Sequence, residues 1–268
     1  MDLSTPVVMG IINITPDSFY KGYLDHSHED IIGLARNMIV QGASILDIGG
    51  QSTKPGSSRI TVKEELNRVI PVIESLHEHF PETILSIDTY YSEVAAFSVK
   101  AGASVVNDIS SGELDKNMIS TVGHLNVPYI AMHMQGTPET MQQNPLYINV
   151  VKEVIEYFIL KKQECIRAGI KDIILDPGFG FGKTNEHNYK LLRELNTLNI
   201  LDCPVLAGVS RKGMIYKTLG ISPSEALNGT TVANTMALMN GAKILRVHDV
   251  KEAVETITIF NTYKNAAL

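Results

Sequence analysis

The hydrophobic positions of this chain fall into short runs that recur along its whole length. The runs lie at residues 7–12, 45–48, 84–87, 104–106, 129–132, 173–175, 205–209 and 244–247. Most of them are continuous rather than alternating, which is typical of strands in a parallel sheet that is covered on both faces. The pattern therefore predicts buried parallel strands.

Amphipathic helical patterns lie between these runs, most clearly at residues 31–40, 63–79, 92–100, 150–168 and 188–195. A strand followed by a helix, repeated about eight times, predicts an α/β fold of the TIM (β/α)8 barrel type. A doubly wound open sheet is the alternative fold with the same order of elements.

A weak internal repeat favours the barrel. Residues 42–47 (GASILD) resemble residues 102–107 (GASVVN) and 241–246 (GAKILR), and Gly169-Ile170 before residues 173–176 is a longer version. In each copy a glycine, which reaches the left-handed conformation at low cost, closes a helix before a buried strand. No linker or change of composition interrupts the chain, so we expect residues 1–268 to form a single domain.

Composition narrows the class of protein. With 44% hydrophobic and 19% charged residues, the chain has the composition of a packed globular protein. Its formal net charge of -6 argues against a nucleic-acid partner, because such proteins usually present a basic face. The first residues do not resemble a signal peptide, and no apolar run approaches the ~18 residues of a membrane helix. We therefore expect a cytoplasmic protein with no membrane partner.

Polar or charged side chains close every predicted strand. In order they are Asn13, Asp47, Asp88, Asn107 with Asp108, His133, Asp176, Ser210, and Arg246 with His248. Any one of them could simply cap a turn. Because buried charge is costly unless it is paired or used, and because barrel enzymes carry their active sites where the strands end, the whole set predicts a functional site at one rim.

The residue types at this rim indicate the kind of ligand. Carboxylate and amide groups can read the edge of a flat nitrogen heterocycle, and the candidates are Asp88, Asn107 and Asp176. Hydrogen-bond donors that are cationic, or that become cationic on protonation, suit a phosphate or diphosphate. The candidates are Lys212, Arg246 and His248. Asn13 offers a neutral oxygen of the sort that Mg²⁺ accepts. We infer an anionic substrate that carries a nitrogen heterocycle.

Three glycine-rich segments stand out. Residues 178–184 (GFGFGKT) look like a phosphate-binding loop, but three residues separate Gly178 from Gly182 where the P-loop needs four. Residues 15–22 and 49–58 follow early strands, and loops of this type often close over a substrate. Phe179 and Phe181 flank a strand end, where they either pack in the core or line an apolar pocket.

Eight segments between Met9 and Val250 carry recognisable motifs: GIINITPDSF at 10–19, DIGG at 47–50 followed by Ser52 and Thr53, SIDT at 86–89, NDI at 107–109, MHMQG at 132–136, DPGFGFGK at 176–183, SRK at 210–212 and RVHDV at 246–250. In this order they resemble the dihydropteroate synthase family of folate biosynthesis. The resemblance implies a pterin-binding barrel transferase that joins 6-hydroxymethyl-7,8-dihydropterin diphosphate to 4-aminobenzoate and releases diphosphate.

The resemblance also implies roles for individual residues. The pterin would be held by Asp88, Asn107, Asp176, Lys212 and Arg246, and the diphosphate by Asn13, Arg246 and His248, with Asn13 near Mg²⁺. Catalysis would depend on Lys212, Arg246, Asp88 and Asp176. The 4-aminobenzoate pocket would be shaped by Thr53, Pro55, Phe181 and Ser210. A homodimer that is a sulfonamide target is implied as well.

The chain departs from the family pattern in both early loops. Gln51 and Lys54 stand where the family usually has Glu and Arg, and Tyr20-Lys21 stands where it usually has Ser-Asp. These changes concern loop closure, Mg²⁺ handling and the aminobenzoate pocket, and they leave the pterin residues untouched. Two other functions are compatible with the pterin residues: a pterin-dependent methyltransferase, and a pterin-binding relative without catalytic activity.

Overall fold

The computed structural model describes residues 2–14, 28–52, 57, 59–141 and 143–266. Several sequence-based expectations lie outside these residues, namely those on segment 15–22, on Tyr20 and Lys21, and on Thr53, Lys54 and Pro55 of the second loop. Within the described part of the chain, no helix is both long and apolar enough to cross a membrane.

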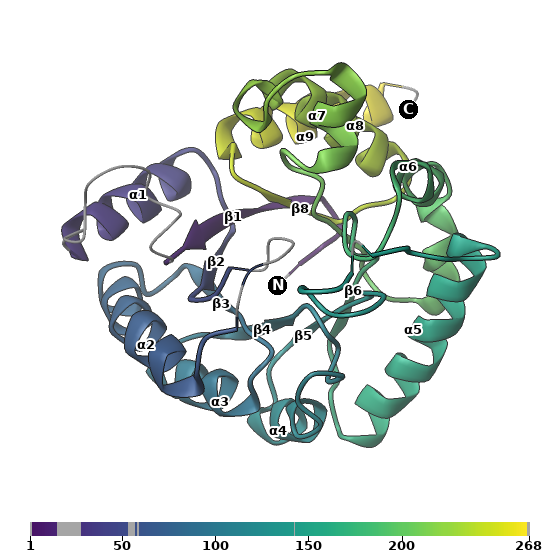
Figure 1. Cartoon of the computed structure of the whole chain (residues 1–268). Coiled ribbons are helices and arrows are strands. Elements are labelled where there is room, and N and C mark those ends of the chain that lie inside the picture. Colours follow the sequence, from purple (N-terminus) through teal and green to yellow (C-terminus); the bar gives the residue numbers. More distant parts are fainter. Residues whose placement is uncertain (1, 15–27, 53–56, 58, 142, 267–268) are drawn as a thin grey trace.

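Eight parallel strands form the centre of the fold (Figure 1). They are β1 Val7–Asn13, β2 Ile45–Gly49, β3 Ile84–Asp88, β4 Val105–Asp108, β5 Tyr129–Met132, β6 Ile173–Asp176, β7 Leu206–Ala207 and β8 Ile244–Val247. Their order along the sheet is β6-β5-β4-β3-β2-β1-β8-β7. A parallel bridge between Leu175 and Val205 joins the two outer strands. The sheet therefore closes, which confirms the barrel and excludes the open sheet.

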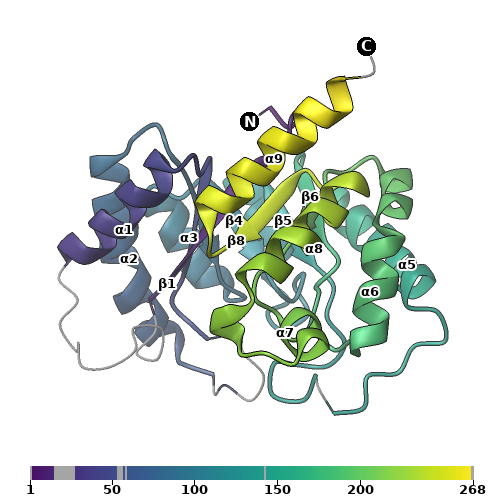
Figure 2. The same cartoon turned by 90° about the horizontal axis from the view of Figure 1, so that it is seen from above.

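Helices surround the strands in Figure 1. They are α1 His28–Val40, α2 Val62–His79, α3 Ser92–Ala101, α4 Met118–Leu125, α5 Val150–Arg167, α6 Asn185–Arg193, α7 Gly213–Leu219, α8 Leu227–Met239 and α9 Val250–Asn265, with 3-10 turns at Leu195–Leu201 and Pro223–Glu225. The five helices predicted from amphipathic patterns are all present. Figure 2 shows α7 at the opposite end of the barrel from the C-terminal part of α9.

One predicted strand is shorter than expected. The apolar run at 205–209 contributes a strand at Leu206–Ala207 alone. The chain then turns, and the Lys212 N–H donates to the Val209 carbonyl at 3.1 Å. Hydrophobicity marks these residues as buried but does not reveal where the backbone leaves the sheet.

The repeated glycines end helices, as predicted. Gly42, Gly102, Gly169 and Gly241 have φ angles of 101°, 124°, 90° and 95°, and they follow α1, α3, α5 and α8 within two residues. At Gly102 a Cβ would lie 2.5 Å from the His77 ring. Both the positive φ and the close contact therefore require glycine there.

Candidate active site

The interior of the barrel changes from apolar to polar along the strands. Its floor is a buried cluster with one side chain from each of seven strands: Met9, Ile45, Val105, Ile130, Ile174, Leu206 and Ile244. Because side chains alternate along a strand, the inward positions two residues later are Ile11, Asp47, Asn107, Met132, Asp176, Gly208 and Arg246. The strand register thus places polar groups together at the carboxyl ends of the strands.

Arg246 joins two buried carboxylates across this mouth. Its Nε donates to Asp47 Oδ2 at 2.6 Å, and its Nη2 donates to Asp88 Oδ2 at 2.6 Å. Asn107 Nδ2 also donates to Asp47 Oδ2, at 3.0 Å. Asp47 is fully buried and Asp88 is 8% exposed. The charge-assisted bonds therefore fix the Arg246 guanidinium and the Asn107 amide relative to each other.

Asp176 lies close to Arg246 on the other side of Gly208. A Cβ placed on Gly208 would lie 3.9 Å from both Arg246 Cβ and Asp176 Oδ2. Asp176 Oδ1 accepts from the Gly178 N–H at 2.8 Å. The structure thus brings the acidic and basic candidates to one mouth, although they come from distant parts of the sequence.

Lys212 faces the turn after β6. Its Nζ donates to the Phe179 carbonyl and lies 4.6 Å from the centroid of the Phe181 ring, within the range of a cation–π contact. Phe179 is fully buried, whereas Phe181 is partly buried against Tyr90, Ile109 and Met132. Of the two aromatics, Phe179 packs in the core and Phe181 borders the site.

Two of these groups titrate near neutral pH. Burial raises the pKa of Asp88 to about 7, against the opposing effect of Arg246. Burial lowers the pKa of Lys212 to about 8, against the opposing effect of Asp176. Burial also raises the pKa of Asp176, and Lys212 opposes that shift. Shifts of this kind are concentrated at functional sites.

Ser210 and His248 form a pair at the same mouth. Ser210 Oγ lies 3.0 Å from His248 Nδ1, and the backbone N–H of His248 donates to Ser210 Oγ at 3.3 Å. Burial lowers the pKa of His248 to about 4, and Arg246 adds to the shift. The imidazole is therefore neutral at pH 7 and offers a hydrogen bond rather than a positive charge.

Asn13 ends β1 beside Gly49 of β2. A Cβ on Gly49 would lie 3.5 Å from Asn13 Oδ1 and 3.7 Å from Asp88 Oδ2. Asn13 Oδ1 is an oxygen of the kind that Mg²⁺ accepts together with phosphate and water, whereas Asp88 Oδ2 is already paired with Arg246. Among the described residues there is no group of three or more His, Cys, Asp and Glu that could hold a metal.

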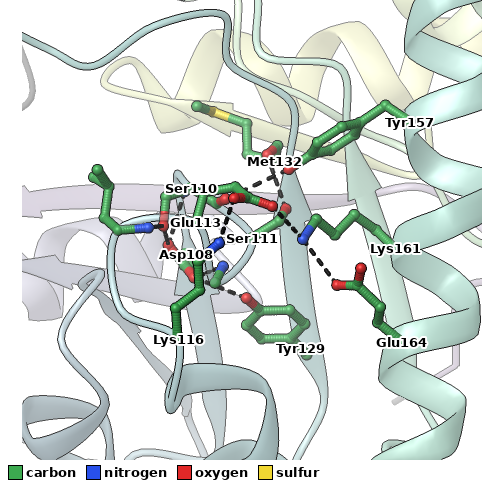
Figure 3. A network of polar contacts seen from close by, with 12 residues as sticks. Asp108, Ser110, Ser111, Glu113, Lys116, Tyr129, Met132, Tyr157, Lys161 and Glu164 are labelled. Atoms are coloured by element: carbon green, nitrogen blue, oxygen red, sulfur yellow. Dashed lines mark hydrogen bonds and ion pairs between the residues drawn. The ribbon is translucent and has the colours of Figure 1, made fainter.

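Two strand-end residues do not join the mouth. Asp108 follows the inward-facing Asn107 and so faces outward, where its carboxylate accepts bonds from Ser110, Gly112 and the Tyr129 hydroxyl (Figure 3). His133 lies beyond Met132, and its Nδ1 is 2.9 Å from Lys183 Nζ. Placing every strand-end residue at one rim was therefore wrong for these two.

Asp47 is the site residue that sequence reasoning undervalued. From its place at a strand end, a turn cap is the favoured explanation for Asp47, and the family resemblance implies no role for it. In the structure it is fully buried and accepts from both Asn107 and Arg246. Asp47 follows the buried Ile45 by two residues, and this spacing places it on the inward face of β2.

A closed β/α barrel with polar groups gathered at the carboxyl ends of its strands is the architecture of an enzyme that binds a small polar ligand. Comparison with known proteins defines the class, because residues 9–248 match the family of pterin binding enzymes. Dihydropteroate synthase from Escherichia coli (strain K12) is 46% identical over 261 residues, which cover 97% of this chain and 92% of the relative. Dihydropteroate synthase from Haemophilus influenzae is 40% identical over 268 residues, which cover 99% and 97%.

Solved structures agree with this match. The Yersinia pestis dihydropteroate synthase with a sulfonamide drug complex has a TM-score of 0.94 at 40% identity, and the match covers 99% of this chain and 96% of that one. The Xanthomonas albilineans dihydropteroate synthase with 4-aminobenzoic acid has a TM-score of 0.92 at 39% identity, with coverage of 99% and 95%. The chain belongs to the dihydropteroate synthase family of pterin-binding enzymes.

Proposed function

We propose that this chain transfers the 7,8-dihydropterin-6-ylmethyl group from its diphosphate to 4-aminobenzoate, forming 7,8-dihydropteroate and releasing diphosphate. The bacterial relatives named for this activity are 40% and 46% identical over nearly the whole chain. The observation that carries the proposal is that acidic and basic side chains lie together at one mouth of the barrel. Buried carboxylates of Asp88 and Asp176 lie beside the cations Arg246 and Lys212.

The acidic side of the mouth binds the pterin. A carboxylate accepts several hydrogen bonds, so Asp176 can receive ring and amino N–H groups while it keeps the Gly178 N–H. Asn107 gives one N–H to Asp47, which leaves its carbonyl oxygen and second N–H for the ligand. Lys212 donates to an acceptor on the ring. The Arg246 guanidinium stacks on the ring face.

The basic side of the mouth stabilises the leaving group. The Arg246 guanidinium and the neutral His248 imidazole donate hydrogen bonds to the diphosphate, where negative charge builds as the bond breaks. The backbone N–H of His248 already donates to Ser210 Oγ, so the Ser210 hydroxyl can donate its proton to His248 Nδ1, and the imidazole proton then lies on Nε2. If Mg²⁺ is bound, Asn13 would be one of its ligands, and the ion would supply further positive charge to the diphosphate.

The substitution is dissociative. The C–O bond breaks and its electron pair leaves with the diphosphate, while the positive charge at the methylene spreads into the dihydropterin ring. Asp88 and Asp176 stabilise that charge. The amine nitrogen of 4-aminobenzoate then forms the C–N bond and releases a proton to solvent. An arylamine is already nucleophilic, so the chain needs no strong base. Among the described residues, Phe181 and Ser210 shape the pocket for this amine.

Product formation tests the proposal. Purified protein is incubated with 6-hydroxymethyl-7,8-dihydropterin diphosphate, 4-aminobenzoate and Mg²⁺, and diphosphate and dihydropteroate are measured. We expect diphosphate release that requires 4-aminobenzoate. Pterin binding without turnover would instead identify a non-catalytic relative, and methyl transfer from a pterin donor would identify the methyltransferase.

The pH dependence of kcat/KM for the dihydropterin diphosphate should be a narrow bell. Asp88, with a pKa of about 7, must be ionised to accept bonds from the pterin, so the rate falls as pH drops below 7. Lys212, with a pKa of about 8, must be protonated to donate, so the rate falls as pH rises above 8. The variant Lys212→Arg should move the alkaline limb upward, because a guanidinium stays charged. A flat profile between pH 6 and 9 would contradict both assignments.

Sulfonamides should compete with 4-aminobenzoate. A Yersinia pestis relative has been solved with a sulfonamide drug, and Phe181 and Ser210 provide the described part of the same pocket here. We expect inhibition that raises the KM for 4-aminobenzoate and leaves kcat unchanged. Inhibition unaffected by 4-aminobenzoate would show that Gln51, Lys54 and the other loop differences have rebuilt the pocket.

We also infer that the chain acts as a homodimer in the cytoplasm. Residues 1–268 of each chain form one domain. The family relationship supports the dimer. Sedimentation of the purified protein should give about twice the chain mass of 29.4 kDa, independently of substrates.

A further inference from the structure

Lys183 is a buried lysine that the proposed reaction does not use. Its side chain is 3% exposed. Its Nζ lies 2.9 Å from His133 Nδ1 and donates to the carbonyls of His133, Gly178 and Phe181 at 3.2, 3.0 and 3.0 Å. Burial lowers the pKa of His133 to about 2, so the ring is neutral and Nδ1 can accept. Burial also lowers the pKa of Lys183 well below its ordinary value. The lysine of the P-loop-like segment therefore faces backbone carbonyls instead of a phosphate.

These carbonyls belong to the turn after β6 and to the chain after β5. In the turn, Gly178, Gly180 and Gly182 have φ angles of 67°, 82° and 63°. A Cβ on Gly178 would lie 2.0 Å from the His133 carbonyl oxygen, and one on Gly182 would lie 2.3 Å from that of Gln135. The turn is thus packed backbone to backbone, and Lys183 is the donor placed among its carbonyl groups.

The same turn supports the candidate site on its other side. The Phe179 carbonyl accepts from Lys212 Nζ, and the Phe181 ring lies 4.6 Å from that atom. The Gly178 N–H donates to Asp176 Oδ1 at 2.8 Å. A displacement of the turn would therefore move the contacts of Lys212 and of Asp176 together.

We propose that Lys183 is a positioning residue that holds the turn at residues 178–182, and through it places Phe181 for the aminobenzoate step and Lys212 for the pterin. Lys183 is buried beneath the turn and acts through these residues rather than on substrate. Its kinetic consequence rests on the proposed function, whereas its effect on Phe181 can be measured without turnover.

The test removes the donor with little change of side-chain length. In Lys183→Met, buried carbonyls face an apolar group, which favours opening of the turn to water. We expect the KM for 4-aminobenzoate to rise about tenfold or more, since small misplacements are costly, and pterin affinity to fall as well, because the same turn contacts Asp176 and Lys212. Lys183→Gln keeps N–H donors on a shorter chain and should give an intermediate KM; it also serves if the Met variant folds poorly.

Lys161→Met is the matched control. Lys161 is also buried, at 6% exposed, but its ammonium pairs with Glu113 at 2.6 Å and Glu164 at 2.8 Å (Figure 3), and neither is a candidate site residue. We expect this variant to lower the melting temperature without changing the KM for 4-aminobenzoate.

Fluorine NMR of 4-fluorophenylalanine placed at position 181 provides the readout that needs no turnover. Its resonance should shift or broaden in Lys183→Met and stay unchanged in Lys161→Met. If the wild type has no synthase activity, the function proposal fails while this measurement still decides the role of Lys183. An unchanged resonance in Lys183→Met, or a KM that changes no more than in the control, would overturn the inference.

Discussion

Arg246→Ala is expected to lower kcat about 10²–10³-fold, the range seen when one donor to a developing negative charge is removed. Arg246 reaches the mouth from β8, and Asp47 and Asp88 hold its guanidinium at 2.6 Å each. Because the diphosphate takes up charge as it leaves, the loss should fall on the chemical step. Affinity for the free pterin should fall only about tenfold, through lost stacking. Steady-state kinetics and calorimetric titration with pterin measure the two effects separately.

The same substitution removes the partner of two buried carboxylates. Breaking a buried ion pair typically costs about 3–5 kcal/mol, so the melting temperature must be followed and kinetics measured well below it. Arg246→Lys keeps a positive charge but loses the planar fork that gives Asp47 and Asp88 separate nitrogen donors. It should therefore recover part of the turnover. Equal losses of turnover and of pterin affinity would argue against a role on the diphosphate.

The strands and several helix ends were predictable because the signals are local. Continuous apolar runs mark β5 and most of β6 because both faces of these strands are buried. The repeat marks Gly102 and Gly241 because a positive φ after a helix favours glycine. The repeated strand–helix order is compatible with both the barrel and the open sheet, and the bridge between Leu175 and Val205 decides between them.

The internal arrangement of the site was not predictable in the same way. Asp47 and Arg246 are 199 residues apart in sequence, and no local pattern shows that one carboxylate serves both Arg246 and Asn107. Position at a strand end predicts Asp108 and His133 to lie at the mouth, because this criterion ignores the alternation of side chains along a strand. The fold decides such contacts through strand register, which pairs Asp47 with Ser86 and Asp88 with Asn107.

Asp176→Asn should weaken pterin binding by roughly 10²-fold or more. Two charge-assisted hydrogen bonds of about 1.5–3 kcal/mol each are lost or reversed, and about 1.4 kcal/mol corresponds to tenfold in affinity. The Asn side chain can still accept the Gly178 N–H, so the turn after β6 keeps that contact. Asp172→Asn is the matched control, because Asp172 is exposed and lies just before the same strand. Calorimetric titration with pterin compares the two variants.

The stability of this variant should change in the opposite direction. Burial raises the pKa of Asp176 above its value in the unfolded chain, so ionisation of this carboxylate weakens folding at every pH above the unfolded pKa. A neutral amide avoids that cost, although Lys212 loses a favourable charge. We therefore expect Asp176→Asn to melt at the same temperature as the wild type or higher at pH 8, despite its weaker binding. A lower melting temperature would mean that Asp176 is held for folding, and the loss of affinity could then no longer be assigned to direct contact with the heterocycle.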